Sequence, residues 1–189
     1  MIIASQNLTN FDISLPDETI FRVNLAWVDN LENLKNILKK YKDRKIFLDL
    51  PRNRTKPPNN RYSISELKPI LETFSNIKFL AISNVDSPSD LENFLDLVND
   101  DCVLVPKIES PKGVENIQKI SDVLGTNKII MLDHDDLYSS LLKSNDDPKN
   151  FQKYLKILSD YCTDNDITLL RTIGVLFGDY EKRISEYIK

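Results

Sequence analysis

Short runs of apolar residues recur along the whole chain, and most of them lack polar residues at alternate positions. Such runs are typical of strands that are buried on both faces, as in a parallel sheet. We therefore predict seven strands, at residues 2–4, 20–23, 46–50, 79–82, 103–108, 129–132 and 167–170.

Between most of these runs, apolar residues recur three and four positions apart, which is the spacing of one face of a helix. The clearest examples are Leu31, Leu34, Ile37 and Leu38, and Ile64, Leu67, Ile70 and Leu71. Signals for helix starts agree with this prediction. Ser63 precedes Glu66 by three residues, as in a capping box, and Ser87 and Ser110 are each followed by a proline.

Strands that alternate with helices predict a parallel α/β sheet, either doubly wound or closed into a barrel. Seven strands favour the barrel, but a complete eightfold barrel takes about 250 residues, and this chain has 189. Residues 7–19 contain no convincing helix, and the last strand leaves room for a single helix at 179–188. We expect one domain, residues 1–189, with the fold of a trimmed TIM-type (β/α) barrel of seven strands.

Composition narrows the range of partners and compartments. Lys and Arg total 25 against 29 Asp and Glu, so the net charge of −4 gives no general attraction for nucleic acid or anionic lipid. The sequence has no apolar run long enough to cross a bilayer and no basic segment followed by an extended apolar stretch. We expect a cytoplasmic protein with no nucleic-acid or membrane partner, in which Cys102 and Cys162 are buried thiols.

Polar residues gather where the predicted strands end, which is the rim on which a barrel keeps its active site. Lys107 and Glu109 are two positions apart and share one face of a strand that has little reason to bury two charges. The next strand is followed by Asp133, Asp135 and Asp136 beside the single histidine. Carboxylates from two adjacent strand ends suit Mg²⁺ or Mn²⁺. The plainer alternatives are a surface-facing Lys–Glu pair and a solvated acidic loop that caps the following helix.

Three stretches resemble the barrel domain of pyruvate kinase in both order and spacing. They are Phe-Leu-Ala-Ile-Ser-Asn from residue 79, Val-Pro-Lys-Ile-Glu-Ser from residue 105 and Ile-Met-Leu-Asp-His-Asp-Asp-Leu from residue 130. Arg-Val-Asn at 22–24, and Leu-Asp at 48–49 with the later Arg54, resemble that family's motifs on its second and third strands. The same superfamily holds HpcH/HpaI-type aldolases and citrate-lyase-like enzymes, whose Ile-Glu-Ser motif is also similar to this chain.

The resemblance implies a divalent-metal site, for Mg²⁺ or Mn²⁺, on Glu109 and Asp136. It implies that Lys107 is the catalytic cation beside a transferring phosphoryl group or an enolate oxygen. The substrate implied is a small anion: phosphoenolpyruvate, pyruvate or a related 2-oxo acid. The residues implied to bind it are Arg22, Asn24, Arg54 and Thr172.

The chain also departs from pyruvate kinases. We expect no counterpart of the lid domain that they insert after the third strand or of the domain that they append to the barrel, and so no part that excludes water from the nucleotide. Asn24 and Asp49 match ligands of that family's monovalent-cation site, but Ala26 and Leu50 stand where it has hydroxyl ligands. Asp135 replaces a glycine and adds negative charge beside the metal carboxylates.

Three functions therefore remain open. The first is a pyruvate-kinase-like protein with phosphotransfer, and the second is a metal-dependent lyase of the aldolase or citrate-lyase type. The third is a catalytically degenerate binding or assembly subunit. Because an open barrel exposes strand edges that a second copy of the chain can cover, we also expect a homodimer.

Overall fold

A computed structural model describes residues 1–11, 15–53, 57–99 and 101–172 of the chain. Its centre is a seven-stranded sheet in which every strand is parallel to, and paired with, the next strand in the sequence. The strands are β1 (Ile3–Ser5), β2 (Ile20–Asn24), β3 (Ile46–Leu50), β4 (Ile77–Ile82), β5 (Val103–Ile108), β6 (Ile129–Leu132) and β7 (Thr168–Arg171). The prediction of seven strands is confirmed.

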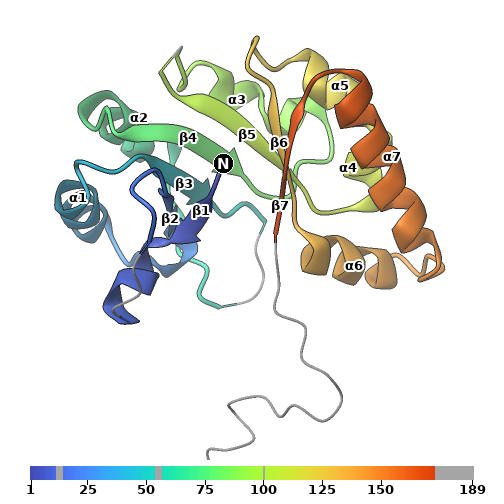
Figure 1. Cartoon of the computed structure of the whole chain (residues 1–189), viewed down its shortest axis with the longest axis horizontal. Helices are drawn as coiled ribbons and strands as arrows, with labels where there is room; N and C mark the ends of the chain where they lie inside the picture. Colours follow the sequence, from blue (N-terminus) through green and yellow to red (C-terminus); the bar gives the residue numbers. More distant parts are fainter. Residues whose placement is uncertain (12–14, 54–56, 100, 173–189) are drawn as a thin grey trace, which may run out of the picture.

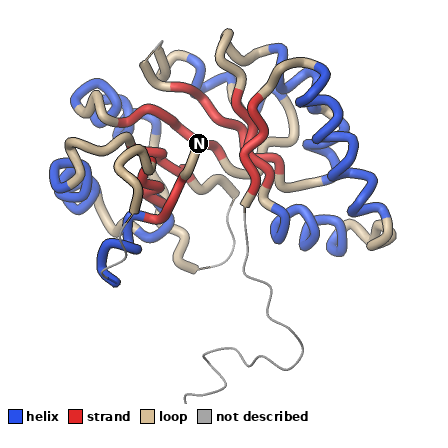
Figure 2. The backbone as a smooth tube through the Cα atoms, viewed as in Figure 1, coloured by secondary structure: helices blue, strands red, loops and turns tan. Residues whose placement is uncertain are grey.

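Helices connect most of these strands and lie on the outside of the sheet (Figure 2). The α-helices are α1 (Leu31–Lys40), α2 (Ile64–Thr73), α3 (Glu92–Leu95), α4 (Pro111–Glu115), α5 (Ile117–Asp122), α6 (His134–Lys143) and α7 (Asn150–Asp164). The 3-10 helices are η1 (Gln6–Phe11), η2 (Leu25–Trp27) and η3 (Pro88–Asp90). Thus a short 3-10 helix stands in the first connection, where the sequence predicted none. The helix predicted at 179–188 lies outside the described residues.

The sheet curves as a barrel does but stays open (Figure 1). Its order runs from β1 at one edge to β7 at the other, and no pairing joins these two strands in the described part of the chain. The fold is therefore a parallel half-barrel with helices on its convex side. Among the described helices, none is long and apolar enough to span a membrane.

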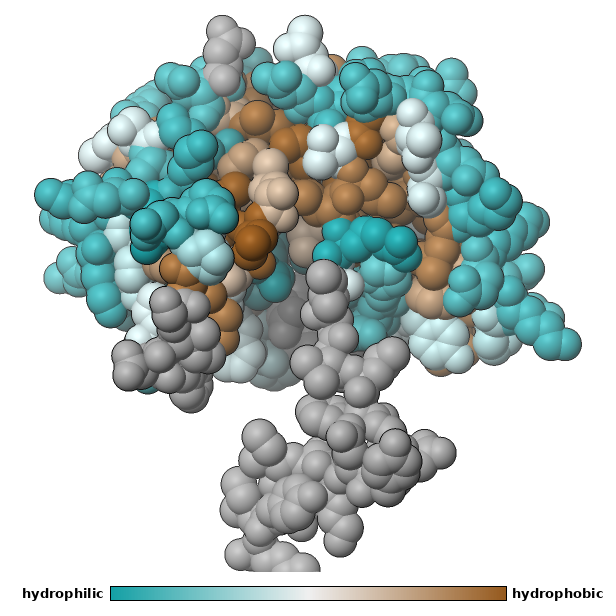
Figure 3. Space-filling model, viewed as in Figure 1, coloured by the Kyte–Doolittle hydropathy of each residue, from teal (hydrophilic) through white to brown (hydrophobic). Residues whose placement is uncertain are grey.

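Side-chain alternation divides the strand residues between two apolar clusters. In β3, Ile46, Leu48 and Leu50 belong to the large cluster that also contains residues of the helices, whereas Phe47 belongs to a smaller one. Because successive strand residues point to opposite faces, the smaller cluster lies on the concave face of the sheet. Its buried members are Ile20, Phe47, Phe79, Ala81, Val105, Ile129 and Met131. Figure 3 shows hydrophobic side chains at the centre of the viewed face and hydrophilic ones around its margin.

The helix starts follow the signals in the sequence. Ser63 and Glu66 form the predicted capping box, in which the Ser63 amide donates to Glu66 Oε2 at 2.7 Å. Ser110 caps α4 by accepting from the Gly113 amide at 3.0 Å. Both cysteines are buried free thiols, as predicted.

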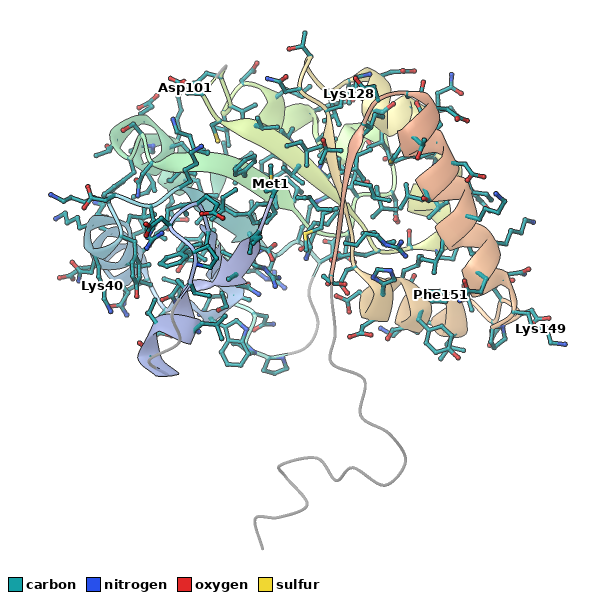
Figure 4. The ribbon with its side chains drawn as sticks, in the orientation of Figure 1. Met1, Lys40, Asp101, Lys128, Lys149 and Phe151 are labelled. Carbon is teal, nitrogen blue, oxygen red and sulfur yellow. The ribbon has the colours of Figure 1, made fainter. Side chains whose placement is uncertain are left out.

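The strands run in one direction, so their carboxyl ends share one rim. Asp101 and Lys128, labelled in Figure 4, precede β5 and β6 and mark the opposite, amino end of the sheet. The carboxyl-end rim lies where α6 begins, far from Lys149 and the start of α7.

Candidate metal and anion site

The polar residues at the strand ends lie on the concave face because they continue its alternation. Asp49 follows Phe47 by two positions in β3, and Lys107 and Glu109 follow Val105 in and after β5. Asp49, Lys107 and Glu109 are exposed by only 2 %, 4 % and 3 %. A surface-facing Lys107–Glu109 pair, one of the sequence alternatives, is therefore wrong.

These groups form one chain of ion pairs. Lys107 Nζ lies 2.7 Å from Glu109 Oε1 and 3.6 Å from Asp49 Oδ2. Asp49 Oδ2 also accepts from Arg22, through Nε at 2.8 Å and through Nη2. Asp49, which matched a monovalent-cation ligand in the sequence, is thus engaged by two cationic side chains of the protein.

Lys107 is held in its charged form. Burial lowers the pKa of this ammonium, but the nearby carboxylates of Asp49 and Glu109 outweigh that effect and leave the pKa above its ordinary value. The ammonium also donates to Ser83 Oγ at 3.2 Å. A protonated, almost fully buried lysine supplies fixed positive charge to the rim.

Glu109 is prepared to accept a cation. Its Oε2 accepts from the Asn84 amide at 2.7 Å, and its Oε1 faces the Lys107 ammonium at 2.7 Å. Burial raises the pKa of this carboxyl, and the charge of Lys107 offsets part of the rise. A buried carboxylate that also lies beside Asp133 and Asp136 is a suitable ligand for a divalent metal ion.

Three carboxylates meet at this point of the rim. One ligand oxygen each from Glu109, Asp133 and Asp136 can be chosen so that all lie within 4.8 Å of one another. Asp133 also caps α6, with its Oδ1 accepting from the Asp136 amide at 3.3 Å. Mg²⁺ and Mn²⁺ prefer oxygen donors of this kind, so the residues fit a divalent ion.

The sequence prediction named Asp136 but missed Asp133 as a metal ligand. Asp133 was visible in the acidic run, but the resemblance to the family motif implied a metal-binding role for Asp136 alone. A signal was present, because Asp133 continues the concave-face alternation of Ile129 and Met131. The alternative of a solvated acidic loop that caps the following helix also fits the run itself, because Asp133 caps α6 and Asp135 and Asp136 are exposed.

A cavity of about 280 Å³ joins these groups. Of the predicted site residues, five line it: Arg22, Asn24, Lys107, Glu109 and Asp136. The other lining residues are Asp49, Pro51, Asn53, Ser83, Asn84, Asp133, Ser139, Ser140 and Lys143. Three basic and four acidic side chains give this lining a net negative charge, so a bound divalent cation would make it attractive to an anion.

Two of the predicted site residues are not among the described residues that line the cavity. Arg54 lies outside the described residues. Thr172 does not line the cavity, and its Oγ1 lies 3.3 Å from both the amide nitrogen and Nδ1 of His134. Substrate contact by either residue stays a prediction.

His134 links β7 to the start of α6. Arg171 Nη2 lies 3.0 Å from His134 Nε2, and since a guanidinium can only donate, Nε2 accepts and the Nδ1 proton is directed to Thr172. Burial lowers the pKa of His134, and the charge of Arg171 lowers it further, while Asp133 and Asp135 act in the opposite direction. These contacts join the end of β7 to the first turn of the helix that carries Asp136.

No protein-family model matches this sequence, and no curated protein matches it. Solved structures do match the fold. A citrate synthase, SbnG, is 14 % identical with a TM-score of 0.67, over 92 % of this chain and 77 % of that one. RipC from Yersinia pestis is 14 % identical with a TM-score of 0.59, over 85 % and 72 % of the two chains. An HpcH/HpaI aldolase/citrate lyase family protein from Burkholderia cenocepacia is 10 % identical with a TM-score of 0.54, over 82 % and 71 %.

At this level of identity the likeness concerns the fold alone. The half-barrel resembles the fold of structures described as a citrate synthase and an aldolase/citrate lyase family protein, and none of the three is described as a pyruvate kinase.

Proposed function

We propose that this chain is a divalent-metal-dependent lyase acting on a 2-oxo acid, of the aldolase or citrate-lyase type, on a trimmed TIM-type barrel. One observation carries the proposal: a single cavity joins the buried Lys107 to three clustered carboxylates. The fold likeness to a citrate synthase and an aldolase/citrate lyase family protein supports this reaction class over phosphotransfer.

Glu109, Asp133 and Asp136 would hold Mg²⁺ or Mn²⁺. When bound there, the ion supplies positive charge that polarises a carbonyl and stabilises an enolate. Glu109 is fixed for this task by the Asn84 amide, and Asp133 by its place at the start of α6.

Lys107 places a second positive charge at the same point. Its ammonium is charged and almost fully buried, so it can donate to the substrate oxygen on which negative charge develops. Such a donor is strongest where water is excluded and the group is already oriented. Asp49, Glu109 and Ser83 orient it here.

Arg22 provides the binding group for a substrate carboxylate. Its Nε and Nη2 bond Asp49, and its side chain is 30 % exposed, which leaves guanidinium protons for a ligand. Arg22 lines the cavity beside Asn24. A volume of about 280 Å³ suits a small organic acid, since it is at the lower limit of ordinary ligand sites.

Two other functions from the sequence analysis remain second candidates. Phosphotransfer could use the same Lys107, Arg22 and metal ion. A degenerate binding subunit is less well supported, because burying Asp49, Lys107 and Glu109 costs free energy that apolar side chains would avoid.

Exchange of the pyruvate methyl protons tests the proposal. Enolate formation in D₂O with Mg²⁺ or Mn²⁺ replaces these protons with deuterium, which ¹H NMR follows without a second substrate. We expect metal-dependent exchange by the protein and its loss in Lys107→Met and in Glu109→Gln. Lys112→Met and Glu115→Gln, at exposed positions of α4, are the matched controls and should exchange normally.

Calorimetric titration of Mn²⁺ with and without oxalate, an enolpyruvate analogue, completes the test. Metal-dependent oxalate binding that disappears in Glu109→Gln supports the site. Transfer of phosphate from phosphoenolpyruvate to ADP without methyl exchange would favour the phosphotransfer candidate. Absence of both exchange and oxalate binding would leave the binding subunit.

We further infer that a second copy of the chain covers the open sheet edges at β1 and β7. Unpaired edges of a parallel sheet are exposed hydrogen-bonding surfaces that proteins usually cover. Light scattering during size-exclusion chromatography should then give the mass of a dimer, and a monomer mass would refute the inference.

A further inference from the structure

The cavity contains three basic side chains, and two of them are already neutralised. Arg22 is paired with Asp49, and Lys107 with Glu109 and Asp49. Lys143 also lines the cavity, but no carboxylate in the described ranges lies within ion-pair distance of it. Among the basic side chains of this lining, Lys143 is therefore the one without a carboxylate partner in the described residues.

The neighbours of Lys143 on α6 are also free donors. Counted from Asp136, three residues of α6 follow at three, four and seven positions: Ser139, Ser140 and Lys143. All four therefore share one face of the helix, and all four line the cavity. Within the part of the chain that the structure describes, neither serine hydroxyl bonds another protein group. Both serines are half-buried.

This face begins at the metal cluster and leads away from it. At 1.5 Å per residue, the seven-residue step from Asp136 to Lys143 corresponds to about 10 Å along the helix. A ligand held near Asp136 by its 2-oxo acid group would thus meet the two hydroxyls and the ammonium with its far end.

We propose that Ser139, Ser140 and Lys143 form a subsite for a second carboxylate, so that the substrate is a 2-oxo dicarboxylic acid. The inference rests on the proposed function, because the first carboxylate is placed by the metal cluster and Arg22. Two hydroxyls and an ammonium match a carboxylate, which accepts several hydrogen bonds. The plainer role of Lys143, a cation in the last turn that favours the helix dipole, leaves the two hydroxyls unexplained.

Binding of matched acids to the Mn²⁺-loaded protein tests the subsite. 2-Oxoglutarate and 2-oxopentanoate have the same chain length, but only the first has a carboxylate at its far end. We expect calorimetry to give about fivefold or tighter binding of 2-oxoglutarate, as a charged hydrogen bond at a partly exposed site provides. In Lys143→Met most of this preference should be lost, because only the two hydroxyls remain, and the affinity for 2-oxopentanoate should be unchanged. Lys119→Met, which removes a last-turn lysine from α5, is the matched control and should keep the preference.

The possible results distinguish failure of the subsite from failure of the proposed function. Equal binding of both acids by the unmodified protein would overturn the subsite while leaving the proposed function intact. An equal loss of both acids in Lys143→Met would also overturn it, since Lys143 would then hold the first carboxylate. If neither acid nor pyruvate binds the Mn²⁺-loaded protein, the proposed function fails and the subsite fails with it.

Discussion

Lys107 Nζ lies 2.7 Å from Glu109 Oε1, and the two residues are exposed by only 4 % and 3 %. The pair is held within one strand end, where alternate residues point to the same face. The same lysine lies 3.6 Å from Asp49 on β3, so it joins two strand ends electrostatically.

Replacing Lys107 with methionine should destabilise the fold by about 3 kcal/mol, because removal of one partner of a buried ion pair leaves an uncompensated charge. Urea unfolding followed by circular dichroism measures this loss. The double variant Lys107→Met with Glu109→Gln should lose less than the single variant, because the orphaned carboxylate is then absent. Strictly additive losses would show that the pair is not coupled.

Asp133 should show two separable roles, as a metal ligand and as the N-cap of α6. Asp133→Asn keeps a good capping side chain but weakens the ligand, so Mn²⁺ affinity should fall at least tenfold with little change in stability. Asp133→Ala removes both functions and should also cost about 1 kcal/mol of stability. Calorimetry and urea unfolding separate the two effects, and equal stability losses in the two variants would contradict the capping role.

His134 should titrate below the ordinary histidine value of about 6.5, because burial and Arg171 both lower its pKa. As the single histidine, it can be followed through its ring protons by ¹H NMR. Since the unfolded state binds the proton more readily, the contribution of His134 to stability is present above the unfolded pKa and lost as pH falls through the folded value.

His134→Gln tests that linkage by comparison. The difference in unfolding free energy between wild type and variant should shrink as pH falls below about 6.5. A difference that grows on acidification would mean that the folded protein prefers the imidazolium, against the contact with Arg171.

Neither thiol should react with an aromatic disulfide reagent at pH 8 in the folded protein. Burial raises the pKa of Cys102 and of Cys162 to about 11, so little thiolate is present and access is blocked. Both should react in denaturant, which gives the control for total thiol. Rapid reaction of one thiol without denaturant would show that the structure opens locally around that cysteine.

Local pattern determined most of the fold. The apolar runs at residues 46–50, interrupted only by Asp49, and at 129–132 predicted strands whose bounds the structure repeats, because a strand covered on both faces is apolar at nearly every position. The capping box at Ser63 was equally visible, since it depends on residues three positions apart. The spacing of Lys107 and Glu109 also predicted their common face.

Contacts between distant segments required the tertiary structure. The sequence could not show that Asp49 bonds Arg22, 27 residues away, or that Thr172 pairs with His134 rather than lining the cavity. Nor could it show whether the barrel closes with seven strands, because the distance between β1 and β7 depends on the curvature summed over all the strands. Alternation and capping are local properties of the chain and follow from residue order alone. Ion pairing across the rim, the addition of Asp133 to the metal cluster and the place of Lys143 in the cavity depend on where whole elements lie, and these were decided by packing.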